Sequence, residues 1–227
     1  MVKIRKTVYG GSLILLLTIA AFTLWMERSF LLLGFLIILL AAVPFYVRFE
    51  KKNMKAEEIV LIASLSAMAA VGRVPFAAFP GIQPTSFIII MAGFTMGPET
   101  GFIIGGTAAI VSNLFLGQGP WTPWQMIAWG LMGWTAGLLR NSRWMKHRAG
   151  LAAFGTAWGF LFGWIMNLWF VLGFFDLYSW SVWLTAFAAS FHFDLAHAAA
   201  NAFLLWLFSE RWIKILGRMT EKFGLLR

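Results

Sequence analysis

The chain has 227 residues, of which 60% are hydrophobic and only 12% are charged. A soluble domain carries about a quarter charged residues, so a water-facing globule is excluded, as are disordered, collagen-like and coiled-coil architectures. The absence of cysteine excludes a disulfide framework and thiolate metal sites. The composition predicts an all-α polytopic membrane protein, in which the net charge of +9 reflects membrane topology rather than nucleic-acid binding.

Eight apolar stretches are long enough, or nearly so, to cross the hydrocarbon core as helices. In chain order they are residues 10–26, 29–47, 57–73, 84–97, 99–117, 122–140, 150–173 and 185–209. The first resembles a signal peptide, but a second apolar run follows almost directly and no clear cleavage site precedes it, so we expect a retained helix. Gly97-Pro98 predicts a tight turn between the fourth and fifth stretches.

The basic residues predict the orientation of these helices. With an even number of spans both termini lie on one side, and that side carries every lysine and arginine except Arg28 and Arg73. Cytoplasmic loops are enriched in these residues, so we expect cytoplasmic termini and a multi-pass protein of the plasma membrane.

The composition changes at residues 48–58, a stretch rich in charge. Residues 1–50 are predicted to form a hairpin of two almost featureless apolar helices. In residues 51–227, by contrast, Gly, Trp, Asn, Gln and His occur within or beside the spans. We therefore expect function in this six-helix core, which ends in a basic cytoplasmic tail.

The first polar group of the core lies in residues 72–85, where three prolines and two glycines predict an ordered loop or a re-entrant segment. It contains Arg73, Gln83 and Thr85. Arg73 either anchors the helix end to lipid phosphates or contacts a substrate, and the sequence leaves both open.

The second group surrounds a Gly-Gln-Gly-Pro turn in residues 112–130. Spacing by four places Trp121, Gln125 and Trp129 on one helix face. Flat apolar area with amide donors and acceptors suits a planar or conjugated ligand. The alternative is an aromatic belt with the glutamines bonded to loop backbone, which explains the tryptophans well but the two glutamines poorly. The candidate binding residues here are Asn113, Gln118, Trp121, Trp124, Gln125 and Trp129.

The third group is Asp194, His197 and Asn201, which share one face of the last span. The carboxylate and the imidazole on neighbouring turns can satisfy each other, and Asn167 of the preceding span can join this network. We expect no metal site, because His192 and Asp194 would point away from one another on a helix.

Several catalytic signatures are absent. The sequence contains no P-loop, no His-Glu-x-x-His and no Gly-x-Ser-x-Gly motif. A helical bundle with an outward polar and aromatic cluster is typical of a binding subunit that needs a partner. The alternatives are an intramembrane enzyme acting on a lipid, with Asp194 and His197 as acid and base, and a purely structural subunit.

Small residues form a stripe on the first core helix, where another helix can approach closely. They are Ala63, Ser66, Ala67 and Ala70. The stripe suits either a partner protein or packing within the chain.

Residues 56–212 resemble the S components of energy-coupling factor (ECF) vitamin transporters, which are six-helix membrane subunits that bind one vitamin or precursor. Ala63 and Ala67 match the family's Ala-x-x-x-Ala stripe. The residues from Gln83-Pro84-Thr85 through Gly101-Phe102, Ser112-Asn113 and Gly117–Gln125 to Trp129-Gly130 are similar to the subgroup associated with cobalamin. The N-terminal hairpin departs from the six-helix pattern.

The resemblance implies a non-enzymatic binding subunit without a cofactor of its own. Ala63 and Ala67 would dock on a transmembrane coupling subunit that works with two cytoplasmic ATPases. A vitamin, best cobalamin or a related corrinoid and otherwise another vitamin or precursor, would bind near the extracellular ends, under the loops 74–84 and 117–123. The ring of the vitamin would pack on Trp121, Trp124 and Trp129. Its periphery would form hydrogen bonds with Gln83, Asn113, Gln118 and Gln125. The inner wall of the site would be lined by Asp194, His197 and Asn201.

Overall fold

The structure is a computed structural model that describes residues 43, 47, 54–79, 81–175 and 179–222. From residue 54 onward the described segments contain six α-helices, a short 3-10 helix and no strand. The helices are α3 (Ala56–Val71), α4 (Thr85–Met96), α5 (Pro98–Leu116), α6 (Thr122–Leu139), η1 (Trp144–Lys146), α7 (Arg148–Phe174) and α8 (Trp180–Lys222). The predicted all-helical class and the six core helices are confirmed, whereas the predicted N-terminal hairpin lies almost entirely outside these residues.

The turn predicted at Gly97-Pro98 is present. Helix α4 ends at Met96, Gly97 has a φ of 100°, and α5 begins at Pro98. Glycine adopts this left-handed region without steric cost, and proline suits the first helical position because its missing N–H would be unpaired there anyway. The sequence therefore fixes this boundary locally.

Helix α8 has 43 residues and is much longer than the apolar stretch 185–209 that predicted it. Hydropathy locates the part of a helix that suits the hydrocarbon core, not the helix itself. No proline interrupts α8, and the helix continues through charged residues such as Glu210 and Lys214. At 1.5 Å per residue it is about 64 Å long, roughly twice the thickness of the hydrocarbon core.

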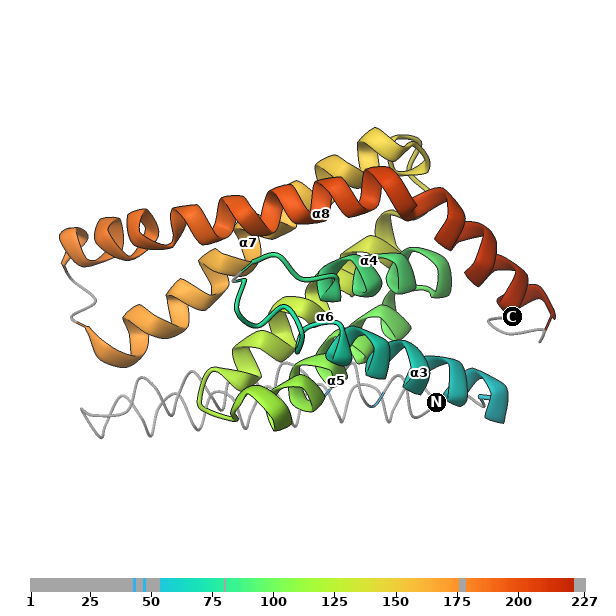
Figure 1. Ribbon diagram of the computed structural model, residues 1–227, viewed down its shortest axis with the longest axis horizontal. Helices are drawn as coiled ribbons and strands as arrows, with labels where there is room; N and C mark the ends of the chain where they lie inside the picture. The colour runs from blue at the N-terminus through green and yellow to red at the C-terminus, as the bar shows by residue number, and fades with distance from the viewer. Residues whose placement is uncertain (1–42, 44–46, 48–53, 80, 176–178, 223–227) are drawn as a thin grey trace, which may run out of the picture.

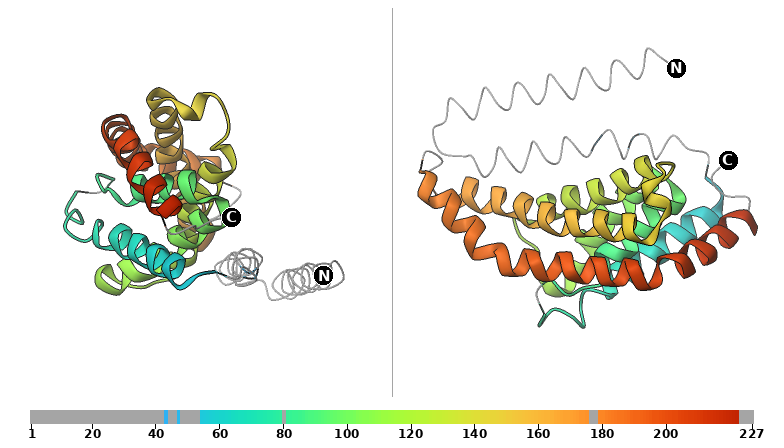
Figure 2. Two further views of the ribbon diagram at one scale, coloured as in Figure 1. Left: turned by 90° about the vertical axis from the view of Figure 1, so that its right-hand side faces the viewer. Right: turned by 90° about the horizontal axis from the view of Figure 1, so that it is seen from above.

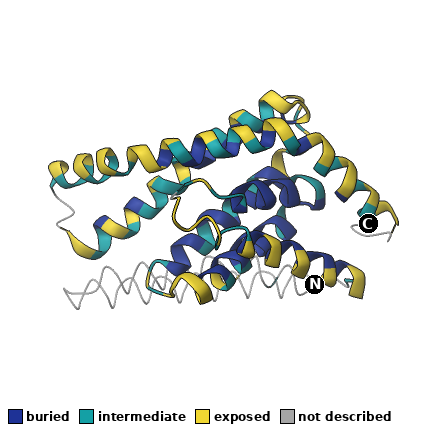
Figure 3. Cartoon of the chain, in the orientation of Figure 1, coloured by how far each residue is buried: buried dark blue, intermediate teal, exposed yellow. Residues whose placement is uncertain are grey.

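The helices form two groups (Figure 1). Helices α3, α4, α5 and α6 pack on one another, and α7 and α8 pair along much of their length, as the right-hand view of Figure 2 shows. The groups meet where α4 contacts α8 and α6 contacts α7. Helix α4 is central, because ten of its twelve residues are buried. Figure 3 shows that the buried residues concentrate on α4, α5 and α6.

Glycines allow the close crossing of α4, α5 and α6. A Cβ atom on Gly101 would lie 2.5 Å from the carbonyl oxygen of Gly133 and 2.7 Å from the Cα atom of Gly93. A Cβ atom on Gly93 or Gly133 would overlap the facing backbone in the same way. Backbone-to-backbone contact of this kind is typical of helices packed through small residues.

Two described helices are long and apolar enough to cross a membrane, namely Pro98–Leu116 and Arg148–Phe174. Helix Thr85–Met96 is apolar but shorter. The count of eight spans and the cytoplasmic location of both termini stay predictions of the sequence.

An ion pair joins the start of α7 to α8 outside the predicted spans. The Arg148 guanidinium donates from Nε and Nη2 to the two carboxylate oxygens of Glu210. Both side chains are about half exposed, so water and salt weaken the pair. The hydrogen bonds and charge of Arg148 lower the pKa of the Glu210 carboxyl.

We expect Glu210→Gln to lower the thermal unfolding temperature slightly at pH 7. A carboxyl group whose pKa is depressed in the folded protein contributes stability above its unfolded pKa and loses it as the pH falls through its folded pKa. The difference between wild type and variant should therefore vanish in acid. Unfolding of the purified protein followed from pH 7 to pH 3 measures it, with Glu221→Gln on the same helix as the control. A difference that persists at pH 3 would contradict this role.

Candidate ligand-binding site

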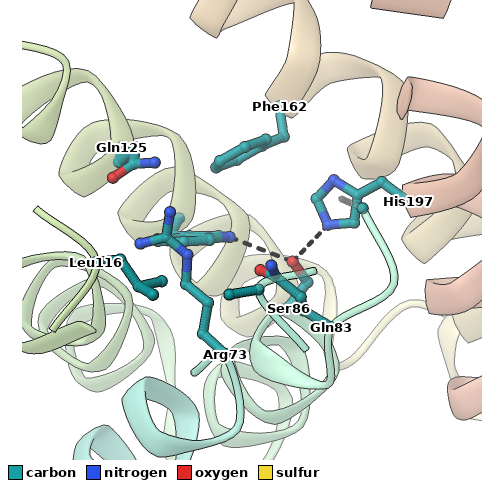
Figure 4. Close-up of a pocket in the computed structure, with 10 residues that line it drawn as sticks. Arg73, Gln83, Ser86, Leu116, Gln125, Phe162 and His197 are labelled. Atoms are coloured by element: carbon teal, nitrogen blue, oxygen red, sulfur yellow. Dashed lines mark hydrogen bonds between the residues drawn. The ribbon is translucent and has the colours of Figure 1, made fainter. Parts of the chain in front are cut away.

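A cavity of about 410 Å³ lies beneath loop 72–84, between the two helix groups (Figure 4). This volume is within the range of small-molecule sites. Its walls come from the loop, from α4, α6, α7 and α8, and from the end of α5. The lining residues are Arg73, Ala77, Gly81, Gln83, Ser86, Leu116, Gln125, Trp129, Phe162 and His197. Polar and aromatic side chains from segments far apart in sequence thus meet in one place.

Loop 72–84 is irregular, as its prolines and glycines predict. Its turns are held by backbone hydrogen bonds such as Ala77 N–H to Val74 C=O (3.2 Å) and Phe79 N–H to Phe76 C=O (2.9 Å). Gly81 has a φ of 83°, and a Cβ atom there would lie 2.8 Å from the carbonyl oxygen of Phe193 on α8. Glycine thus lets the loop lie against α8 and cover the cavity.

Arg73 leaves the end of α3 and points into the cavity (Figure 4). Its Nη1 donates to Ser112 Oγ (2.9 Å) and to Asn113 Oδ1 (2.5 Å) on α5. The guanidinium carbon lies 5.2 Å from the ring centroid of Trp129, within the range of a cation–π contact. These neutral partners fix the position of the cation.

Asn113 connects Arg73 to the second polar group. Its side chain is 1% exposed, and its Nδ2 donates to Thr122 Oγ1 (3.0 Å) and to Gln125 Oε1 (2.7 Å). The Gln125 carbonyl is thereby occupied, while its amide nitrogen has no hydrogen-bond partner among the described residues. Asn113 does not line the cavity, but it orients two residues that do.

Ser86 connects the aromatic wall to α8. Trp129 Nε1 donates to Ser86 Oγ (3.2 Å), and the same hydroxyl shares a hydrogen bond with His197 Nε2 (2.7 Å). Phe162 of α7 stacks on Trp129 with centroids 4.9 Å apart and meets the His197 ring edge-on at 5.2 Å. This cluster joins the two helix groups at the floor of the cavity.

The sequence did not single out Ser86 or Phe162. Ser86 follows Gln83-Pro84-Thr85 directly, and its polar side chain at the start of a mostly apolar helix is the signal that could have found it. Phe162 carries no such signal, because phenylalanine is common throughout this chain.

Besides Asn113, four predicted residues of the first two polar groups do not line the cavity. Thr85 Oγ1 donates to the Ala69 carbonyl (2.9 Å) and so ties α4 to α3. Trp121 meets Trp169 edge-on at 5.9 Å, and Trp124 is buried. Gln118 is exposed; its Nε2 donates to Ile110 C=O (2.8 Å), and its Oε1 accepts from Thr122 Oγ1 (2.9 Å). Ligand contact by these four stays a prediction.

Asp194, His197 and Asn201 share one buried face of α8, as their spacing predicts. The mutual satisfaction of Asp194 and His197 that we expected is not observed. Asp194 Oδ2 accepts from Ser190 Oγ (3.0 Å), which in turn accepts from Asn167 Nδ2 (2.7 Å).

The absence of a side chain at Gly163 explains this difference. A Cβ atom there would overlap the Asp194 carboxylate, so the glycine lets Asp194 lie against α7 instead of turning toward His197. Asn201 Nδ2 donates to the Gly155 carbonyl (3.1 Å), also on α7. Only His197 of the three lines the cavity. Within the described ranges no three metal-ligating side chains come together.

A helical bundle that encloses a ligand-sized cavity of aromatic and polar residues is the kind of structure expected of a membrane binding subunit. The sequence model of the family "ECF transporter, substrate-specific component" matches residues 57–208, which is more than half of the chain. The chain therefore belongs to the substrate-specific components of ECF transporters. No solved structure matches it.

Similar proteins come from Aliivibrio and Vibrio species. The chain is 29% identical over 91 residues to a UPF0397 protein of Aliivibrio fischeri (strain MJ11) and to one of Aliivibrio salmonicida (strain LFI1238). The matched segment covers 38% of this chain and 49% of each relative. A UPF0397 protein of Vibrio atlanticus (strain LGP32) matches at 29% over 91 residues, or 50% of its length. The chain spans about half the length of the curated relatives it matches.

Family membership settles the class of protein. Substrate-specific components are membrane-embedded parts of a transporter that work with an energy-coupling module, and they are not enzymes. The alternative of an intramembrane enzyme is therefore set aside.

Proposed function

We propose that this chain captures a vitamin or vitamin precursor in the cavity beneath loop 72–84, on the extracellular side of the plasma membrane, for ATP-driven uptake. The observation that carries the proposal is the cavity itself. It has a volume of about 410 Å³, and its wall combines the aromatic rings of Trp129 and Phe162 with the polar groups of Arg73, Gln83 and Gln125. Polar groups placed beside aromatic rings give a site both affinity and orientation.

Two classes of ligand are candidates. The similarity of residues 83–130 to the cobalamin-associated subgroup supports cobalamin or a related corrinoid. The volume of about 410 Å³ supports a smaller, single-ring vitamin or precursor, because a corrinoid macrocycle with its side chains would extend well beyond that space. The geometry favours the smaller ligand.

The partner in this proposal is a transmembrane coupling subunit with two cytoplasmic ATPases. Ala63 and Ala67 are exposed on α3, whereas Ser66 and Ala70 of the same predicted stripe are buried within the chain. Exposed small residues let a partner helix approach closely, which supports docking at Ala63 and Ala67. Co-purification of the chain with a coupling subunit and an ATPase pair tests this step.

The first experiment on the ligand is the visible absorption spectrum of the full chain, purified in detergent from cells grown with cobalamin. A stoichiometric corrinoid band would identify that ligand. A colourless protein that fails to bind added cobalamin in calorimetry would remove it and direct the titrations to smaller vitamins.

For whichever vitamin binds, we expect Gln125→Ala to weaken affinity by about tenfold or more, since the free amide of Gln125 faces the cavity and such a loss corresponds to about 1.4 kcal/mol. Asn141→Ala is the control, because this exposed amide side chain follows α6 outside the cavity and its removal should leave affinity within about twofold. Calorimetric titration of both variants measures the difference. Equal losses in both variants, or none in Gln125→Ala, would place the ligand elsewhere.

A further inference from the structure

The charge of the cavity is unbalanced. Of its ten lining residues, Arg73 is the single one with a permanent charge, and none is a carboxylate. Among the residues that the structure describes, Arg73 forms no ion pair. Its observed partners are the neutral side chains of Ser112, Asn113 and Trp129. Removing a cation from water is costly unless an anion or several good acceptors compensate it.

The hydrogen bonds of Arg73 leave one edge of the guanidinium open. Both side-chain bonds use Nη1, and neither Nη2 nor Nε donates to any described residue. The planar fork of a guanidinium matches the two oxygens of a carboxylate or a phosphate. Because Asn113 and Trp129 fix the group, little conformational entropy is lost when a ligand binds to that edge.

The nearby amides add donors to the same space. Gln125 uses its carbonyl oxygen to accept from Asn113, so its amide nitrogen is the group left for a ligand. The Gln83 side chain has no hydrogen bond to any described residue, and both glutamines line the cavity with Arg73. Asp194, the acidic residue of α8 that is nearest in sequence to His197, accepts from Ser190 and is not part of the lining. The polar wall is therefore rich in donors and lacks negative charge.

From this geometry we infer that the transported ligand carries a carboxylate or phosphate group, which binds the open edge of the Arg73 guanidinium. The inference rests on the proposed capture function and adds the charge of the ligand to it. It also gives Arg73 a role in selecting among vitamins, because a neutral analogue of the same shape would leave the cation without a counter-ion. Cavity residues such as Trp129 and Phe162 would then contact the rest of the ligand.

The test uses pairs of vitamins that differ only in the anionic group. The full chain in detergent is titrated by calorimetry with nicotinate and nicotinamide, pantothenate and pantothenol, biotin and biotinamide, and pyridoxal phosphate and pyridoxal, with cobalamin as a further compound. For the pair that binds, we expect the anionic member to bind at least about tenfold more tightly than its neutral partner.

Arg73→Gln should reduce that preference to about threefold or less while it changes the affinity for the neutral member little. Arg73→Lys retains the charge but not the fork, so an intermediate preference is expected, and this variant keeps the test valid if Arg73→Gln does not fold. Arg143→Gln removes an exposed cation away from the cavity and should keep the full preference. This control separates a local contact from an effect of net charge.

Equal binding of both members of a pair, or tighter binding of the neutral member, would overturn the anionic ligand and leave the capture function standing. If cobalamin alone binds, its phosphodiester is the anionic group, and an affinity that is unchanged in Arg73→Gln would overturn the inference in the same way. A preference that survives in Arg73→Gln would also overturn it. If Arg73 instead binds a lipid phosphate, the pairs will not be discriminated. Failure of every compound to bind would overturn the capture function, and this inference with it.

Discussion

Replacing Gly101 with alanine should prevent the chain from folding or destabilise it severely. The added methyl group would lie 2.5 Å from the carbonyl oxygen of Gly133 and 2.7 Å from its carbonyl carbon, both in the backbone of α6. A flexible side chain could move aside, but a helix backbone moves only with the rest of its helix. We therefore expect a loss of about 3 kcal/mol or more, at the upper end for overpacking.

Gly217→Ala provides the matched control for this prediction. Gly217 also lies within a helix, α8, and a Cβ atom there meets nothing within 4 Å. Both substitutions gain the same intrinsic helix propensity, up to about 1 kcal/mol, so their difference isolates the packing of α5 against α6. Thermal unfolding and the yield of monodisperse protein in detergent measure it. Similar stability of the two variants would show that the close crossing of α4, α5 and α6 is not required.

Asn113→Ala should impair both stability and ligand binding. The substitution removes the acceptor of Arg73 and the donor to Thr122 and Gln125, and it leaves buried polar groups without partners. Each such group costs about 1–3 kcal/mol, so we expect a total loss of stability of about 2–4 kcal/mol. With Arg73 and Gln125 no longer held in place, ligand affinity should fall about a hundredfold.

Leu114→Ala is the control for Asn113→Ala, because Leu114 follows directly on α5 and is 69% exposed. It should leave unfolding temperature and affinity nearly unchanged. A calorimetric titration beside a thermal melt separates the two effects of Asn113→Ala. Normal affinity in a destabilised Asn113→Ala protein would mean that Asn113 supports the fold but does not position the site.

Local signals in the sequence predicted much of the fold. The apolar stretches predicted the core helices, and Gly97-Pro98 predicted a turn, because both features depend on residues adjacent in the chain. The full length of α8 was missed, because hydropathy does not follow a helix beyond its apolar part. The cavity itself was also out of reach, since it forms where loop 72–84 meets helices that lie far apart in sequence.

The residues of the candidate site show the same difference between what local sequence signals predict and what packing between distant segments decides. Helical spacing correctly placed Asp194, His197 and Asn201 on one face, but it could not identify the facing groups. The facing groups depend on how α7 and α4 pack against α8. Gly163 of α7 leaves room for Asp194, and Ser86 of α4 shares a hydrogen bond with His197. Periodicity therefore predicts which residues share a face, and tertiary packing decides what that face contacts.

The cavity lies on the boundary between the two helix groups, and this location affects how the molecule responds to its cargo. Arg73, Ser86 and Trp129 belong to the first group, whereas Phe162 and His197 belong to the second. A ligand that contacts both helix groups would hold them together. At a free ligand concentration of a hundred times the dissociation constant, binding would add about 2.7 kcal/mol to the free energy of unfolding. We therefore expect the empty protein to open more readily along this boundary than the loaded protein.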